Sequence, residues 1–481
     1  MNNDNPKINA VVDGLRYKTQ IADSTNQPMT LSERMAYYKV PGVSIAVINE
    51  GRLDWAKGYG LVTDATDSKS IDTETLFQAA SISKAINAMG ALLLVQNGQL
   101  LLDEDVNLYL KSWKIPENKF TQKEKVTLRR LLSHSAGISL HGFPGFTTDA
   151  PIPSTLDLLE SRKPALETDL FRVIQEPGAT FQYSGGGTTI VQLLIEDITG
   201  EKYDVWMQRN VLMPLHMTRS TFAQPLTQEA ARNAAQGHQS DGTLISGGWH
   251  VYPYMAAAGL WTTPTDLAYF IVELLKMLNH QPGILQSVLI NEAITPQITI
   301  EQWYSDTISE ASGLGFFLAG SGENLKFAHD GGNAGFIGRF IALPERGKGF
   351  VIMVNNDGAF SLIDEITHSI ADVYGIPGFE PIERPEMKMT DMTQYSDFVG
   401  TYQHQDDELT ISIHDNKLFL SFWYSQEMQL HREHDDLFFI QESSDTVRLI
   451  KLGDNTYQVN VINNEETVYR KIISSQIYDP I

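Results

Sequence analysis

The segment Ser81-Ile82-Ser83-Lys84 lies where a loop, residues 72–80, gives way to a predicted helix. Apolar residues at helical spacing continue from this segment toward Gly98, where we expect the helix to end. Positions i and i+3 of a helix lie on one face, one above the other. We therefore expect the Ser81 hydroxyl and the Lys84 amine to meet at the start of this helix.

This pairing predicts a reactive serine. A serine hydroxyl is a weak nucleophile until a base takes its proton. A lysine can be that base when burial or neighbouring cations lower its pKa. The helix N-terminus also directs backbone N–H groups toward a developing oxyanion. The alternative is a capped helix with a solvated lysine, but the chain holds no second S-x-x-K pattern.

Two further segments place reactive residue types beside glycine-rich breaks. Tyr183-Ser184-Gly185 precedes a predicted helix, so the phenol of Tyr183 lies on a turn, where it can relay a proton. His329-Asp330-Gly331-Gly332 precedes two apolar segments, 336–341 and 349–354, which we expect to be adjacent antiparallel strands. Taken singly, these residues have structural alternatives, namely a hydrogen-bonded core tyrosine and a satisfied histidine.

Together the three motifs resemble the serine β-lactamase and penicillin-binding-protein family, in its class C-like branch. That branch also holds carboxylesterases and D-aminopeptidases. The resemblance extends over about residues 30–375, and the order and spacing of the matching segments fit the family. Besides the three motifs, the segments that carry it are 41–47, 57–60, 75–80, 127–128, 131–138, 214–217 and 257–264.

The resemblance implies a catalytic role for several residues. Ser81 is the nucleophile that becomes acylated, and Lys84 is its base partner. Tyr183 matches the tyrosine of the family's Y-x-N motif and shares the proton transfer with Lys84. The backbone amides of Ser81 and Gly332 form the oxyanion hole. The implied reaction is a two-step acyl transfer, in which water or another acceptor resolves the acyl-enzyme.

The resemblance also implies substrate-binding positions, and the chain departs from the family pattern in two of the motifs. Gly185 stands where the family has an asparagine. His329, Asp330 and Gly331 match the K-T-G or H-x-G motif, with His329 and Asp330 at the places of the lysine and hydroxyl residue that hold a β-lactam's carboxylate. A neutral imidazole beside a carboxylate is a poor carboxylate receptor. We expect weak β-lactamase activity or none, and a preference for neutral acyl donors.

Composition limits the other classes of function. The 481-residue chain has a net charge of −23, which argues against nucleic acid and anionic membranes as partners. The sequence has no cysteine, and His431 and His434 sit in a strand-and-turn setting, so we expect no metal site and no cofactor. No apolar run is long enough to span a membrane. No signal peptide is visible, so we expect a cytoplasmic protein, or a periplasmic or secreted one if an export signal was removed.

A second domain is expected near the C-terminus. Residues 379–392 are rich in proline and lack periodicity, as linkers do. After them, apolar and polar residues alternate over 409–413 and 418–422 with a turn between, which predicts an antiparallel meander closed into a small barrel. This resembles the lipocalin-like domain of some family members. We assign 1–378 to the hydrolase domain, 379–392 to a linker and 393–481 to the barrel.

The predicted fold class is α+β: an antiparallel sheet flanked by helices, an all-helical subdomain and the C-terminal barrel. The predicted function is hydrolysis of carboxylic esters or small amides. Two alternatives stay open: a peptidase or aminopeptidase specific for D-amino acids, and a non-catalytic binder of cell-wall fragments or a protein partner. The expected partners are a small ester, amide or D-peptide substrate and, through the barrel, further copies of the chain.

Overall fold

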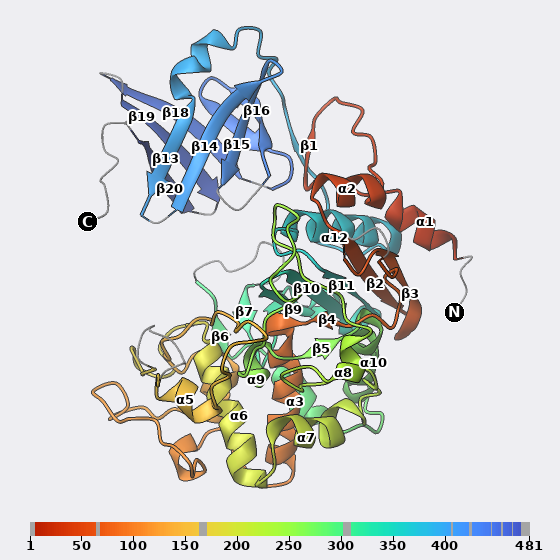
Figure 1. Cartoon of the computed structure of the whole chain (residues 1–481), viewed down its shortest axis with the longest axis vertical. Helices are drawn as coiled ribbons and strands as arrows, with labels where there is room; N and C mark the ends of the chain where they lie inside the picture. The colour runs from red at the N-terminus through yellow and green to blue at the C-terminus, as the bar shows by residue number, and fades with distance from the viewer. Residues whose placement is uncertain are drawn as a thin grey trace. The chain divides into compact units, whose positions relative to one another are not determined.

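The computed structural model describes residues 5–63, 68–162, 171–301, 309–405, 407–422, 426–443, 445–453, 456–463 and 465–472. The described residues divide into two compact units (Figure 1). One unit comprises residues 39–359, and the other comprises residues 5–38 together with 360–472.

The first unit is built on an eight-stranded sheet in which all neighbouring strands are antiparallel, in the order β3-β2-β11-β10-β9-β8-β7-β6. β-branched and aromatic residues, which favour pleated and buried positions, dominate its central strands. The strands are β2 (Gly42–Asn49), β3 (Arg52–Gly60), β6 (Ile298–Thr299), β7 (Ala311–Ser312), β8 (Phe317–Ala319), β9 (Lys326–Asn333), β10 (Phe336–Leu343) and β11 (Lys348–Val354). A separate two-stranded ribbon joins β4 (Phe77–Gln78) to β5 (Trp261–Thr262).

Helix α3 (Ser83–Gln96) is the central helix of this unit, and nearly all of its side chains are buried. It packs against α6 (Gly185–Thr199) and α9 (Met255–Ala258), while α10 (Pro264–Leu278) packs on β2, β3 and β11. The remaining helices and turns of this unit are η1 (Ala80–Ile82), η2 (Val106–Leu108), α4 (Leu128–Leu132), α5 (Thr155–Leu159), α7 (Tyr203–Met207), the π-helical turn η3 (Gln208–Leu212), α8 (Gln228–Ala231), α11 (Ser287–Ala293), η4 (Gly322–Asn324) and η5 (Pro344–Arg346).

The second unit contains an eight-stranded closed antiparallel barrel. Its interior is filled by apolar side chains contributed by alternate positions of the strands, including the fully buried Tyr402, Leu420 and Phe438. The barrel strands are β13 (Gly400–His404), β14 (Asp407–His414), β15 (Lys417–Phe422), β16 (Met428–His434), β17 (Leu437–Ile440), β18 (Thr446–Gly453), β19 (Thr456–Asn463) and β20 (Glu465–Lys471).

The second unit also contains segments from before and after the first unit in sequence. They are α1 (Pro6–Val12), β1 (Thr19–Ile21), α2 (Leu31–Tyr37), α12 (Phe360–Tyr374), β12 (Ile382–Arg384) and η6 (Thr393–Phe398). Both α1 and α2 pack on α12. Arg34 of α2 forms a bidentate ion pair with Glu365 of α12, and both side chains are buried. Such a pair needs complementary partners on both sides, which fixes the pairing of these helices.

Residues 379–392, which the sequence predicts as a linker, are bonded to their surroundings within this unit. β12 pairs in parallel with β1, and Arg384 forms an ion pair with Glu433 of the barrel. Thr19 of β1 in turn donates its backbone N–H to the Gln441 carbonyl at 3.2 Å and its hydroxyl to the Ser443 carbonyl at 3.0 Å. The β1–β12 ribbon thus attaches the barrel to the N-terminal segment, which the proline-rich pattern does not reveal.

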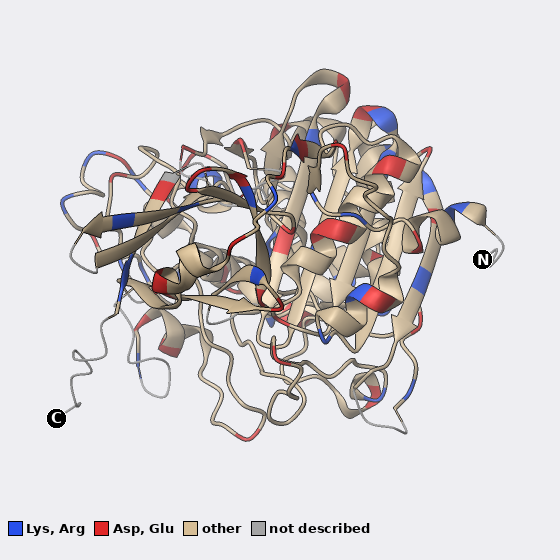
Figure 2. Cartoon of the chain, turned by 90° about the horizontal axis from the view of Figure 1, so that it is seen from above, with Lys and Arg blue, Asp and Glu red and all other residues tan. Residues whose placement is uncertain are grey.

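The predicted fold class is confirmed: an antiparallel sheet with flanking helices, and a C-terminal antiparallel barrel. In the described parts of the chain, Asp and Glu residues lie on helices, strands and loops alike (Figure 2). Across the described ranges, no helix combines the length and the apolar character needed to cross a membrane.

Candidate active site

Ser81 lies in the short turn η1, directly before α3. The preceding residue, Ala80, is fully buried and has φ +47°, a left-handed conformation that costs a non-glycine residue of order 1–3 kcal/mol. The turn η1 packs against β9, β10 and α9. The surrounding contacts therefore hold Ala80, directly before Ser81, in a backbone conformation that an alanine rarely adopts.

Lys84 faces Ser81 one turn further along, as the i, i+3 spacing predicts. Its Nζ lies 2.9 Å from Ser81 Oγ and donates to the Ala257 carbonyl at 2.8 Å. The Lys84 residue is only 4% exposed. Burial disfavours the ammonium form and lowers the pKa of Lys84 to about 7. The lysine is therefore about half neutral at neutral pH, the state in which it can accept a proton.

Tyr183 lies beside this pair. The Lys84 Nζ is 4.9 Å from the centroid of the Tyr183 ring. The next residue, Ser184, caps α6 through its side chain, so the capped helix start fixes the position of the tyrosine. The Tyr183 ring contacts the rings of His134 and His141, with centroid distances of 4.4 Å and 4.9 Å.

The sequence motifs do not single out the two histidines around Tyr183. His134 accepts a hydrogen bond from the Ser184 backbone N–H through Nδ1, at 3.2 Å. Burial and the nearby Lys84 lower the pKa of both His134 and His141. Both rings therefore add little positive charge near Lys84. The signal that would have identified them is their contact with Tyr183, which joins segments some 40 to 50 positions apart and is not encoded locally.

His329 lies on β9, and the centroid of its ring is 4.9 Å from the centroid of the Phe317 ring. The residue is only 2% exposed, and its Nδ1 is 2.5 Å from the Asp330 carbonyl oxygen. Burial and the positive charge of Lys84 lower the pKa of His329 to about 4. His329 is therefore neutral at physiological pH.

Asp330, which the resemblance assigns to substrate binding, has its carboxylate in an ion pair with a neighbouring strand. Successive residues of a strand face opposite sides of the sheet, so Asp330 points away from the face that His329 and Gly331 share. Its carboxylate forms a bidentate ion pair with Arg339 on the neighbouring strand, both distances being 2.8 Å. The charge of Asp330 is thus balanced on the other face of the sheet.

The glycines of the predicted site lie against other parts of it. A Cβ on Gly331 would approach the Ala79 carbonyl oxygen to 2.2 Å and the Ser81 nitrogen to 3.0 Å, so only glycine fits between β9 and Ser81. Gly332 is the next residue along β9. Beside Gly185, at the start of α6, the His141 carbonyl and the Phe143 ring occupy the space where a side chain would begin. A Cβ at Gly185 would lie 3.1 Å from the His141 carbonyl oxygen and 3.2 Å from the Phe143 ring, so this position is tight for a side chain.

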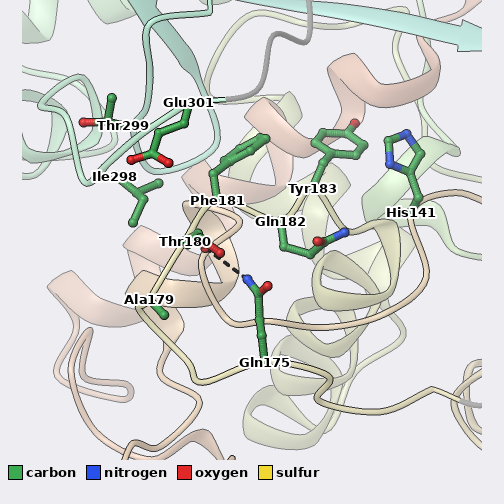
Figure 3. Close-up of a pocket in the computed structure, with 10 residues that line it drawn as sticks. All are labelled: His141, Gln175, Ala179, Thr180, Phe181, Gln182, Tyr183, Ile298, Thr299 and Glu301. Atoms are coloured by element: carbon green, nitrogen blue, oxygen red, sulfur yellow. Dashed lines mark hydrogen bonds between the residues drawn. The ribbon is translucent and has the colours of Figure 1, made fainter.

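A cleft of about 610 Å³ opens beside Tyr183. Figure 3 shows Tyr183, Phe181, His141 and Glu301 around it, with Gln175 donating to the Thr180 carbonyl. Its remaining lining residues are Ala179, Gln182, Ile298 and Thr299. The walls are therefore of mixed polar and apolar character, with Glu301 as their acidic residue.

Comparison with known proteins places the chain in a family. The family model described as Beta-lactamase matches residues 30–373. The chain belongs to the beta-lactamase family. The family is one of serine hydrolases of the penicillin-binding-protein type, and the recognition made from the sequence is confirmed.

Individual relatives are distant. Protein flp of Staphylococcus aureus (strain N315) is 24% identical over 348 residues, which make up 69% of this chain and 64% of that protein. The match thus spans less than two thirds of this relative's length.

Two solved structures share the fold. An octameric penicillin-binding protein homologue from Pyrococcus abyssi has a TM-score of 0.60 at 20% identity, covering 91% of this chain and 98% of that one. A D-amino acid amidase from Ochrobactrum anthropi SV3, complexed with L-phenylalanine amide, has a TM-score of 0.57 at 21% identity, covering 71% of this chain and 96% of that one.

Within the described parts of the chain, no group of three or more His, Cys, Asp or Glu side chains is arranged to hold a metal ion. His431, considered from the sequence for metal binding, is buried in the barrel and interacts with Glu386 at 2.7 Å.

Proposed function

We propose that this member of the beta-lactamase family is a hydrolase that works through an acyl-enzyme on Ser81 and cleaves carboxylic esters or small amides. One observation carries the proposal: the buried Lys84 Nζ lies 2.9 Å from Ser81 Oγ and has a pKa of about 7. A lysine with that pKa can take the serine proton at neutral pH. A protein that only binds a partner has no need of this arrangement.

In the acylation step, Ser81 Oγ attacks the carbonyl carbon of the substrate while its proton passes to the neutral Lys84. The carbonyl oxygen gains negative charge, which the amides of Ser81 and Gly332 are proposed to stabilise. Collapse of this intermediate breaks the bond to the leaving group. Lys84 and Tyr183 return the proton to the departing oxygen or nitrogen, so the products are the acyl-enzyme and a neutral alcohol or amine.

In the deacylation step, a water molecule attacks the acyl carbon. The base formed by Lys84 and Tyr183 takes the water proton, the bond between Ser81 Oγ and the acyl carbon breaks, and Oγ recovers a proton. Lys84 returns to its neutral starting state when this proton passes on to Ser81 Oγ, and its amine donates to the Ala257 carbonyl. One molecule of water is consumed in each cycle, and no cofactor is required.

A second candidate function is cleavage of amides of D-amino acids. It is supported by the shared fold of the D-amino acid amidase from Ochrobactrum anthropi SV3, which covers 71% of this chain. The neutral His329 also leaves that position without the cation that would hold a substrate carboxylate. The acyl-enzyme chemistry would be the same, with an amine in place of an alcohol as the leaving group.

Assembly into homo-oligomers is proposed as well. The Pyrococcus abyssi homologue, which shares the fold over 91% of this chain, is described as octameric. Light scattering on the purified chain would measure the mass of the assembly.

A substrate screen tests the proposed function. Wild type and Ser81→Ala are compared on p-nitrophenyl acyl esters and on D- and L-amino-acid p-nitroanilides. The proposal expects turnover in one of these series and its loss in Ser81→Ala. Faster ester turnover supports the esterase, and faster turnover of D-amino-acid anilides supports the second candidate. Turnover that persists in Ser81→Ala would refute the acyl-enzyme on Ser81.

A further inference from the structure

The hydrogen bond of His329 fixes which ring nitrogen carries its proton. Nδ1 lies 2.5 Å from the Asp330 backbone carbonyl oxygen. A carbonyl oxygen only accepts, so Nδ1 must be the donor of this bond. In the neutral imidazole the other nitrogen, Nε2, then carries a lone pair and is an acceptor. The ring therefore presents an acceptor at the position where the family pattern has the ammonium of a lysine, a donor.

This acceptor is available to a ligand. Nε2 of His329 has no hydrogen-bond partner among the residues that the structure describes, although the residue is 98% removed from solvent. His329 shares its strand face with Gly331, whose missing side chain makes room for the Ser81 amide. Two residues along a strand span about 7 Å, so the imidazole stands roughly that far along β9 from the point where β9 meets Ser81. An acceptor without a protein partner can take a hydrogen bond from a donor that a ligand brings.

The cations around His329 are already engaged. Arg339 is bound in its ion pair with Asp330 on the opposite face of the sheet. Lys84 is bound to Ser81 and to the Ala257 carbonyl. A substrate carboxylate placed at His329 would thus meet a lone pair where it needs a donor, and neither cation is free to neutralise it.

We propose that His329 makes this part of the site select substrates that bring a hydrogen-bond donor, such as a primary carboxamide or an ammonium group on the leaving group, over substrates that bring a carboxylate. The selection arises because Nε2 accepts a hydrogen bond from an N–H group but cannot donate one to a carboxylate oxygen. This inference rests on the proposed acyl-enzyme function and names the substrate class of that site.

A pair of matched thioesters tests the selection. Benzoylglycyl thioglycolate and benzoylglycyl thioglycolamide have the same acyl group and differ only in the leaving group, which ends in a carboxylate or in a primary carboxamide. Release of the thiol gives kcat/KM for each. For wild type we expect the carboxamide to be favoured by about 10- to 100-fold, the size of one hydrogen bond gained and one repulsive contact avoided.

Substitutions at position 329 assign the selection to this residue. His329→Lys restores a donor and should reverse the ratio in favour of the carboxylate. The glutamine of His329→Gln carries both a donor and an acceptor, so the ratio of kcat/KM between carboxamide and carboxylate should be close to one. This variant tests the role of His329 if the lysine variant does not fold. His238→Gln, which removes another fully buried histidine of the same unit, is the control and should keep the wild-type ratio.

Two results would overturn the inference: a wild-type ratio at or below one, or a ratio that neither substitution at position 329 changes. A fluorophosphonate probe, which carries neither leaving group, separates this failure from failure of the proposed function. If the probe labels Ser81 in wild type and in the variants while the thioester ratio stays fixed, only the role of His329 is wrong. If Ser81 is not labelled at all, the proposed function itself fails.

Discussion

Replacing Lys84 by methionine should remove activity and at the same time make the protein more stable. Methionine keeps the length of the side chain and removes the buried amine. The pKa of Lys84 falls from 10.5 to about 7 because the amine is buried. This shift corresponds to a cost of about 5 kcal/mol for keeping the ammonium form in the folded state.

The gain in stability is smaller than this cost because the variant also loses two contacts. Lys84 interacts with Ser81 Oγ and with the Ala257 carbonyl, and each hydrogen bond contributes about 1 kcal/mol. We therefore expect Lys84→Met to raise the free energy of unfolding by about 3 kcal/mol at pH 7 and below. Ser81 should no longer be acylated in this variant.

The difference between wild type and variant should depend on pH in a defined direction. Below pH 7 the amine of Lys84 is protonated in both the folded and the unfolded wild type. The full free-energy cost of burying the ammonium group then reduces the stability of the wild type. Between pH 7 and about 10.5 only the unfolded wild type is protonated, so its stability rises by about 1.4 kcal/mol per pH unit and the difference shrinks. Above about pH 10.5 this cost is absent.

Urea unfolding, followed by tryptophan fluorescence, measures this difference. Trp55, Trp206 and Trp261 are buried in the same unit as Lys84 and report on its unfolding. Urea titrations of both proteins at pH 6, 8 and 10 should show that the difference in their free energies of unfolding becomes smaller as the pH rises. Lys123→Met, at an exposed position, is the control and should show no such difference. A Lys84→Met variant less stable than wild type at pH 6, or a difference independent of pH, would refute the reasoning.

Three further predictions concern neighbouring residues. Lys84→Ala, Tyr183→Phe and their double variant should fall to similar residual kcat, because residues that act as a unit do not lose activity additively. Gly331→Ala should slow labelling of the nucleophile by a fluorophosphonate at least about 100-fold, since its Cβ would force β9 away from the active-site turn. Arg339→Met should cost about 3–5 kcal/mol of unfolding free energy by leaving the Asp330 carboxylate unpaired, and adding Asp330→Asn should recover part of it.

Each of these predictions has a result that contradicts it. Purely additive losses in log kcat would show that Lys84 and Tyr183 act independently. Gly142→Ala, at a glycine with open space around it, is the matched control for Gly331→Ala, and equal labelling rates in the two variants would rule out the steric argument. An Arg339→Met variant as stable as wild type would mean that the ion pair with Asp330 contributes nothing net.

The parts of the fold predicted correctly are those with a local signal. The i, i+3 spacing places Lys84 beside Ser81, because a helix of any sequence brings these positions together. The turn-helix boundary at Ser184 follows from its capping side chain. The barrel follows from alternation over short strands, where burial of one face imposes a period of two.

The parts that were missed depend on contacts between distant segments. The parallel pairing of β1 with β12 joins residues more than 350 positions apart, and neither short strand has a pattern that specifies its partner. The clustering of His134 and His141 around Tyr183 likewise follows only from the folded chain. The ion pair of Asp330 with Arg339 could have been predicted from the sequence. A tight turn at Ala334–Gly335 sets a strand register that puts these two residues opposite each other.

The central claim is that Ser81 is the residue that becomes acylated, with neutral Lys84 as its base. The most direct measurement is mass spectrometry of the full chain after reaction with a fluorophosphonate probe at pH 8, followed by digestion and mapping of the adduct. The account predicts a single adduct on Ser81 in wild type, and none in Ser81→Ala or Lys84→Met. An adduct on another serine, or undiminished labelling of Ser81 in Lys84→Met, would contradict it.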